Sequence, residues 1–119
     1  MHNHLNPMQV ESEILRLSSL LEDRVSDYQT AIVRAAEAEA RWKFVSAKTL
    51  LEVIEQYPGR QHTVAEREAH VEVATCNEHA ACLITEATAK AVRESLTAIR
   101  TQIEGLRTLA ASQRALTAP

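Results

Sequence analysis

The chain has 119 residues, of which 45% are hydrophobic and 24% are charged, with two glycines and three prolines. This composition excludes a disordered chain and predicts a single folded domain over residues 1–119. The formal net charge of −3 provides no general attraction to nucleic acid or to an anionic membrane, and no apolar run approaches the roughly 20 residues of a membrane span.

A long first helix is predicted over about residues 7–57. Asn6 supplies an N-cap, Pro7 suits the first helical position, and Gln9 is placed to complete a capping box. Apolar residues then recur at steps of mostly three and four, as in a helix that packs against a second helix. This first series is Val10, Ile14, Leu17, Leu21, Val25, Tyr28, Ile32, Ala35, Trp42 and Val45.

A turn is predicted over residues 58–63. Pro58 lacks an N–H group and disfavours the helical conformation of the residue before it, so the first helix should end by Tyr57. Gly59 permits a left-handed backbone. Thr63 and Glu66 have the spacing of a capping box, which predicts a new helix start.

The second helix is predicted to run without interruption over about residues 64–114. Its apolar series is Val71, Ala74, Ala81, Ile84, Val92, Leu96, Ile99, Ile103, Leu106 and Ala110. Gly105 weakens this helix by about 1 kcal/mol relative to alanine. Many apolar residues in both helices are alanines, so we expect a thin core with closely spaced helices.

The predicted fold is all-α: a long antiparallel two-helix coiled-coil hairpin. A turn centred on residue 60 places charged residues of opposite sign across from one another at steps of seven along each helix. The pairs at this register are Glu13 with Arg107, Asp27 with Arg93, Arg34 with Glu86, Arg41 with His79, and Lys48 with Glu72, while Arg100 faces Leu20. In strict heptads these positions are not equivalent, so either the apolar period drifts or some of the charges serve another subunit.

The two cysteines are expected to be small core thiols in a reducing compartment. Cys76 and Cys82 lie six residues apart on one predicted helix, about 9 Å along its axis, which is too far for a disulfide between them. His79 lies midway between them, and the three residues are of the types that bind zinc. These three residues are spread over about 9 Å of one helix, and a zinc site would also need a fourth ligand such as His70. We therefore expect no metal site and no cofactor.

Two basic features raise the question of nucleic-acid binding. Arg93, Arg100, Arg107 and Arg114 repeat every seven residues, which is consistent with a row that tracks phosphates or with a solvated face that forms salt bridges to the first helix. The run from Arg41 to Phe44 alternates basic and aromatic residues, but consecutive helical residues point in different directions. Given the negative net charge, we favour the salt-bridge interpretation.

An apolar strip beside the main series is predicted to bind another protein. A single hairpin buries little in an alanine-rich seam and leaves these flanking residues in water. Pairing of two hairpins into a four-helix bundle would cover them, so we expect a homodimer. The candidate interface residues are Leu15, Leu20, Val33, Phe44, Leu50, Val73 and Leu83.

Three stretches resemble small helical proteins of tailed bacteriophages that infect actinobacteria. They are residues 41–48, 63–69 and 96–109, within the last two-thirds of the chain. The resemblance implies a phage-encoded protein, and some proteins of this kind occur near replication or recombination functions. With no leader peptide evident at the first residues, we expect a location in the host cytoplasm.

The expected function is that of a non-enzymatic interaction or assembly module. No glycine-rich phosphate loop, activated nucleophile or paired-carboxylate motif is present in the sequence. Its partner is a second copy of the chain, or a host or phage protein. The alternative is an accessory single-stranded-DNA-binding protein in phage recombination or replication.

Overall fold

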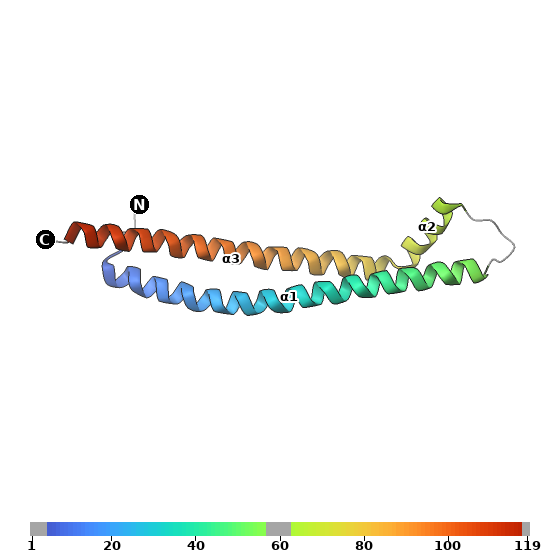
Figure 1. Cartoon of the computed structure of the whole chain (residues 1–119), viewed down its shortest axis with the longest axis horizontal. Coiled ribbons are helices and arrows are strands. Elements are labelled where there is room, and N and C mark those ends of the chain that lie inside the picture. The colour runs from blue at the N-terminus through green and yellow to red at the C-terminus, as the bar shows by residue number, and fades with distance from the viewer. Residues whose placement is uncertain (1–4, 57–62, 118–119) are drawn as a thin grey trace. The chain divides into compact units, whose positions relative to one another are not determined.

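The computed structural model of the chain describes residues 5–56 and 63–117 and is all-α. Its helices are α1 (Pro7–Gln56), α2 (Val64–Ala74) and α3 (Cys76–Thr117) (Figure 1). The chain divides into two compact units. The terminal unit comprises Met1–Gln29 and Lys90–Pro119, and the central unit comprises Thr30–Ala89.

The terminal unit is an antiparallel pair formed by the start of α1 and the end of α3, which lie side by side in Figure 1. Its core is a cluster of Leu17, Ile99 and Ile103, and Leu20 and Leu21 pack against this cluster with Leu106. A turn centred on residue 60 places residue 17 opposite residue 103, so the cluster confirms the predicted register. Within the terminal unit the predicted helical hairpin is therefore correct in sense and in alignment.

The predicted cap of α1 is present as a reciprocal pair of hydrogen bonds. The Gln9 N–H donates to Asn6 Oδ1 at 2.8 Å, and the Asn6 N–H donates to Gln9 Oε1 at 2.9 Å. These bonds satisfy two backbone groups that the first turn of a helix leaves without intrahelical partners. At the same end of the pair, Gln113 Nε2 donates to the Leu5 carbonyl at 2.8 Å and links the residue before the cap to α3.

The central unit contains the second half of α1, all of α2 and the start of α3. Trp42 of α1 stacks on His79 of α3 with ring centroids 4.2 Å apart and an interplanar angle of 3°. This contact lies one residue from the predicted register. The predicted turn falls mostly outside the described residues, but the Thr63 cap is confirmed, because the Glu66 N–H donates to Thr63 Oγ1 at 3.1 Å.

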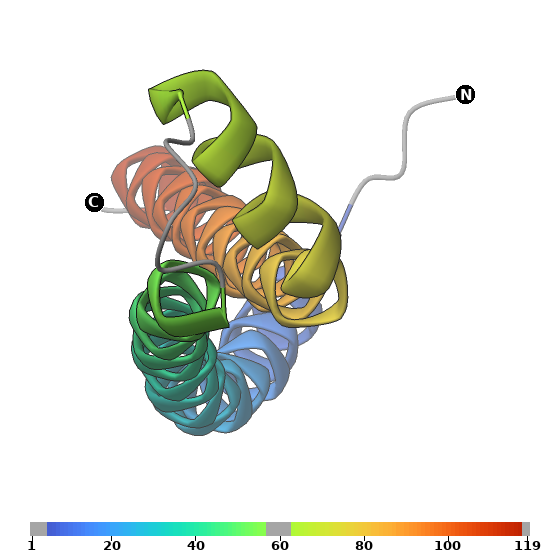
Figure 2. The ribbon, with the colours of Figure 1, turned by 90° about the vertical axis from the view of Figure 1, so that its right-hand side faces the viewer.

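The prediction of one uninterrupted second helix is wrong. α2 ends at Ala74 and α3 begins at Cys76, and Figure 2 shows the change of direction between them. Thr75 has φ −112° and ψ 17°, and both its N–H and its hydroxyl donate to the Val71 carbonyl, at 2.9 and 2.8 Å. A β-branched residue that bonds back to the preceding turn bends a helix. Other threonines of α3, such as Thr88, bond back without a break, and what distinguishes Thr75 is that its side chain is buried.

The predicted apolar series of the second helix is also wrong in its first half. Ala74, Ala81 and Ile84 are exposed, whereas Thr75 and Cys82 are almost fully buried. The face that packs against α1 is rotated by one residue from the series that hydrophobicity favours. The central unit therefore buries a threonine and a cysteine where the predicted series placed alanines.

Candidate interaction surfaces

A second apolar row follows the exposed side of α1 in the central unit. We call it the outer stripe, and it consists of Val33, Ala40, Phe44, Ala47, Leu51 and Ile54. The last four residues are spaced three, four and three apart, which is the spacing of a coiled-coil seam. Phe44 is 69% exposed and Leu51 is 63% exposed, so the stripe is a seam without a partner in the described chain.

The predicted interface residues divide between exposed and packed positions. Leu15, Val33, Phe44, Leu50, Val73 and Leu83 are exposed. Leu20 is half-buried and packs against the core cluster of the terminal unit. Leu51 and Ile54 were not among the predicted residues, although the three-and-four spacing that they share with Phe44 is visible in the sequence.

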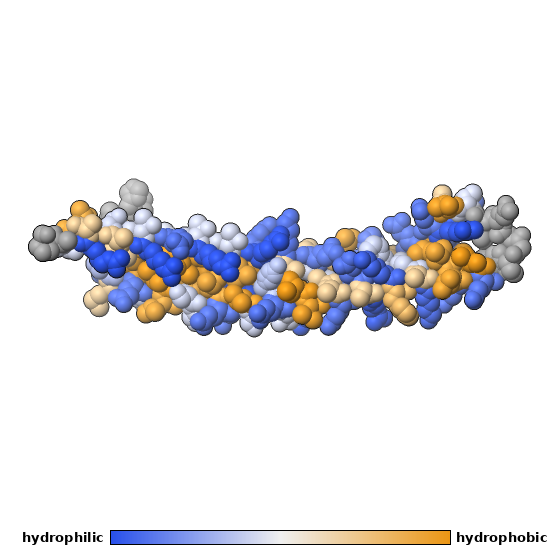
Figure 3. Space-filling view, in the orientation of Figure 1, coloured by the Kyte–Doolittle hydropathy of each residue, from blue (hydrophilic) through white to orange (hydrophobic). Residues whose placement is uncertain are grey.

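An apolar groove of about 620 Å³ lies between α1 and α2 in the central unit. Trp42, Leu50 and Ile54 of α1 line one side of it, and Val64 and Val71 of α2 line the other. Figure 3 shows the apolar side chains that gather between these two helices. Ile54 belongs to the outer stripe and Leu50 lies next to it, and both residues line the groove. The groove and the stripe therefore form one continuous apolar surface.

The groove has a charged border on its α2 side. Glu68 and Glu72 line it together with Arg67. The Nε atom of Arg67 is buried and has no hydrogen-bond partner in the described part of the chain. The α2 side of the groove is therefore partly charged, whereas its α1 side is mostly apolar.

The two cysteines differ in their surroundings. Cys82 is buried, and its Sγ lies 3.4 Å from Glu86 Oε1. Burial raises the pKa of the Cys82 thiol, and the hydrogen bond to Glu86 and the negative charges of Glu86 and Glu39 raise it further. Cys76 is exposed. Within residues 5–56 and 63–117 no group of three or more His, Cys, Asp or Glu side chains is arranged to hold a metal ion.

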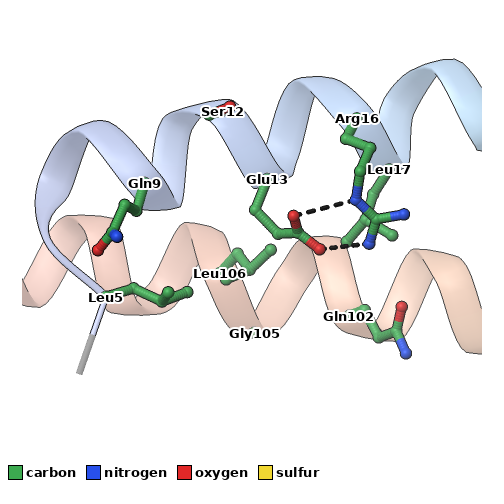
Figure 4. A pocket seen from close by; sticks show the side chains of 9 residues that line it. All are labelled: Leu5, Gln9, Ser12, Glu13, Arg16, Leu17, Gln102, Gly105 and Leu106. Atoms are coloured by element: carbon green, nitrogen blue, oxygen red, sulfur yellow. Dashed lines mark hydrogen bonds and ion pairs between the residues drawn. The ribbon is translucent and has the colours of Figure 1, made fainter. Parts of the chain in front are cut away.

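Within the described residues none of the predicted ion pairs across the hairpin forms, and three of their members pair with neighbours on their own helices. Glu13 pairs with Arg16 (Figure 4), and Asp27 pairs with Arg24 at 2.9 Å. Arg107 pairs with Glu104 at 3.1 Å. The hydrogen bond from Arg16 lowers the pKa of Glu13.

The physical reason is that the two charged rows lie on opposite flanks of the seam. Glu13 lines a groove with Gln102 and Gly105 (Figure 4), whereas Arg114 lines a different groove with Glu11. The other three arginines precede Arg114 at steps of seven and share its flank. Neighbours three residues away on the same helix are therefore closer partners than residues of the facing helix.

The row of four arginines on α3 is exposed along its length. Arg93, Arg100 and Arg114 form no ion pair within the described residues, while Arg107 has Glu104. Figure 3 shows strongly hydrophilic groups recurring along this part of α3. Glu13 and Asp27 of α1, the predicted acidic partners of this row, form ion pairs with arginines of α1 instead.

No protein-family model, curated protein or solved structure matches the chain. The resemblance to helical proteins of actinobacterial phages therefore stays a prediction. In the described part of the chain, none of the helices combines the length and the apolar content that a membrane span requires.

Proposed function

We propose that the protein is a non-enzymatic helical interaction module that assembles with a second copy of itself. One observation carries this proposal. Of the fourteen large hydrophobic side chains that are exposed in the described chain, ten belong to the central unit. They include Val33, Phe44 and Leu51 of the outer stripe and Val73 of α2.

The small core of the central unit supports the same proposal. Its buried residues are Ala31, Val53, Thr75 and Cys82, whereas the terminal unit buries leucines and isoleucines. Apolar burial contributes about 25 cal/mol per Å², and ordering each residue costs roughly 1–2 kcal/mol of backbone entropy. A unit with small buried side chains and large exposed ones gains most from a partner that covers its surface.

Sedimentation velocity over a range of concentrations tests the proposal. We expect the wild-type protein to shift from monomer to dimer as its concentration rises, and the double variant Phe44→Ser/Leu51→Ser to remain monomeric. The matched control is Met8→Ser/Leu116→Ser, which removes two side chains of the terminal unit that are even more exposed. A wild-type protein that stays monomeric at high micromolar concentration, while melting cooperatively, refutes self-association.

A second candidate function is the binding of single-stranded DNA, and the unpaired arginines of α3 favour it. Neutralising each phosphate releases counterions, so affinity should fall steeply as salt is raised. We expect weak binding at physiological salt because the net charge is −3. If binding is tight, Arg100→Ala/Arg114→Ala should reduce it, and Arg16→Ala/Arg24→Ala is the control with the same loss of charge from α1.

A further inference from the structure

We infer that the second copy packs antiparallel along the outer stripe of α1, with the two-fold axis near Thr49. This inference rests on the proposed self-association and adds its geometry. The outer stripe is a coiled-coil seam in its spacing and is exposed on one helix. Two identical seams meet at a closed two-fold contact in which residue i contacts residue j and residue j contacts residue i.

The side-chain sizes along the stripe fit this axis. Phe44 and Ile54 lie five residues on either side of Thr49, so Phe44 of one copy packs against Ile54 of the second copy. Ala47 and Leu51 lie two residues on either side, which places a small side chain against a large one. Leu50, beside the stripe, meets Leu50 of the second copy close to the axis.

The charges that flank the stripe select the same arrangement. In an antiparallel pair each flank of a helix faces the same flank of its partner. One flank carries Arg34, Arg41, Lys48 and Glu55 at steps of seven. With the axis near Thr49, Arg41 of each copy reaches Glu55 of the other, which gives two attractive contacts. Arg41 and Glu55 are exposed and form no ion pair within the described residues of their own chain.

The competing arrangements bring like charges together or bury a carboxylate. Moving the axis to a point between Val45 and Ser46 places Glu37 against Ile54 and Arg41 against Lys48. A parallel pair brings Lys43 of one copy toward Lys48 of the other. Like charges across an interface oppose association, whereas the antiparallel register near Thr49 leaves only the two Lys48 side chains close to each other.

A charge-swap experiment tests this register. Arg41→Glu and Glu55→Arg should each weaken dimerisation by about three- to tenfold, because each turns two attractive pairs into repulsive ones. The double variant Arg41→Glu/Glu55→Arg should restore the wild-type dissociation constant. Arg34→Glu is the matched control, because it lies on the same flank beyond the contact. A dimer whose affinity responds equally to all three single changes overturns the register.

Spin-label distances between the two copies provide an independent measurement. In a background of Cys76→Ser and Cys82→Ala, single labels are placed at residue 34 or at residue 48. An antiparallel pair separates equivalent residues by about 3 Å along the axis for each residue from Thr49, so label 34 should give about 45 Å and label 48 a short distance. Equal short distances at both positions indicate a parallel pair and overturn the inference while leaving self-association intact. A monomer in sedimentation refutes the proposed function itself.

Discussion

The position of the seam on α3 predicts a large difference between two isoleucines that hydrophobicity alone treats as equivalent. Ile103 is 4% exposed and belongs to the core cluster of the terminal unit, whereas Ile84 is 65% exposed. Ile103→Ala removes buried methyl and methylene groups and leaves a cavity, which costs about 2–5 kcal/mol. Ile84→Ala removes groups that already face solvent, and we expect a change within about 0.5 kcal/mol.

Urea unfolding followed by far-ultraviolet circular dichroism measures both free energies of unfolding. Each variant is compared with the wild-type protein at one fixed concentration below the dissociation constant of any dimer, so that association does not contribute to the difference. An unchanged denaturant slope shows that the variants unfold to similar states. If Ile84→Ala costs as much as Ile103→Ala, the face of α3 that packs against α1 has been assigned wrongly.

Three further perturbations have defined outcomes. Iodoacetamide should modify exposed Cys76 in the folded protein and reach Cys82 only on unfolding, as mass spectrometry of digests would show. Because the pKa of Cys82 is raised, its thiol keeps its proton in the folded chain at a pH at which the unfolded chain has lost it. The free energy of unfolding should therefore fall as the pH rises above the ordinary pKa of a thiol. His79→Ala should change the fluorescence of the single tryptophan, because Trp42 stacks on the His79 ring. The control His70→Ala, on the exposed side of α2, should leave the emission spectrum unchanged. Equal spectra for His79→Ala and the wild type would count against the stack. Asn6→Ala removes one half of the capping box and should cost about 0.5–2 kcal/mol in urea unfolding, and an undiminished stability would mean that solvent replaces the cap.

The sequence by itself determined where α1 and α2 begin and how the start of α1 pairs with the end of α3. Asn6 and Thr63 lie at helix starts because short polar side chains satisfy N–H groups that the first turn leaves free, and this requirement is local. The alignment of Leu17 with Ile103 follows from the position of the turn and from the apolar spacing, both of which can be counted along the chain. The terminal unit therefore agrees with the prediction in sense, register and core.

The tertiary structure alone decided which line of residues from the end of α2 to the start of α3 faces α1 in the central unit. The predicted line through Ala74 and Ala81 and the observed line through Thr75 and Cys82 have the same spacing and differ by one residue. Where most candidates are small, hydrophobicity distinguishes poorly between neighbouring lines. The bend at Thr75 is set by the packing of its side chain, which is a property of the folded unit.

The tertiary structure likewise decided that the surface proposed for assembly is exposed. The spacing of Phe44, Ala47, Leu51 and Ile54 is present in the sequence, but a helix with two apolar rows buries only the row that meets its partner. Likewise, Glu13 and Arg107 have opposite signs at matching positions, yet they lie on opposite flanks of the seam and pair with neighbours on their own helices. Spacing along the chain specifies how residues are arranged on one helix, and only the packing of the helices fixes which row is buried and which is left exposed.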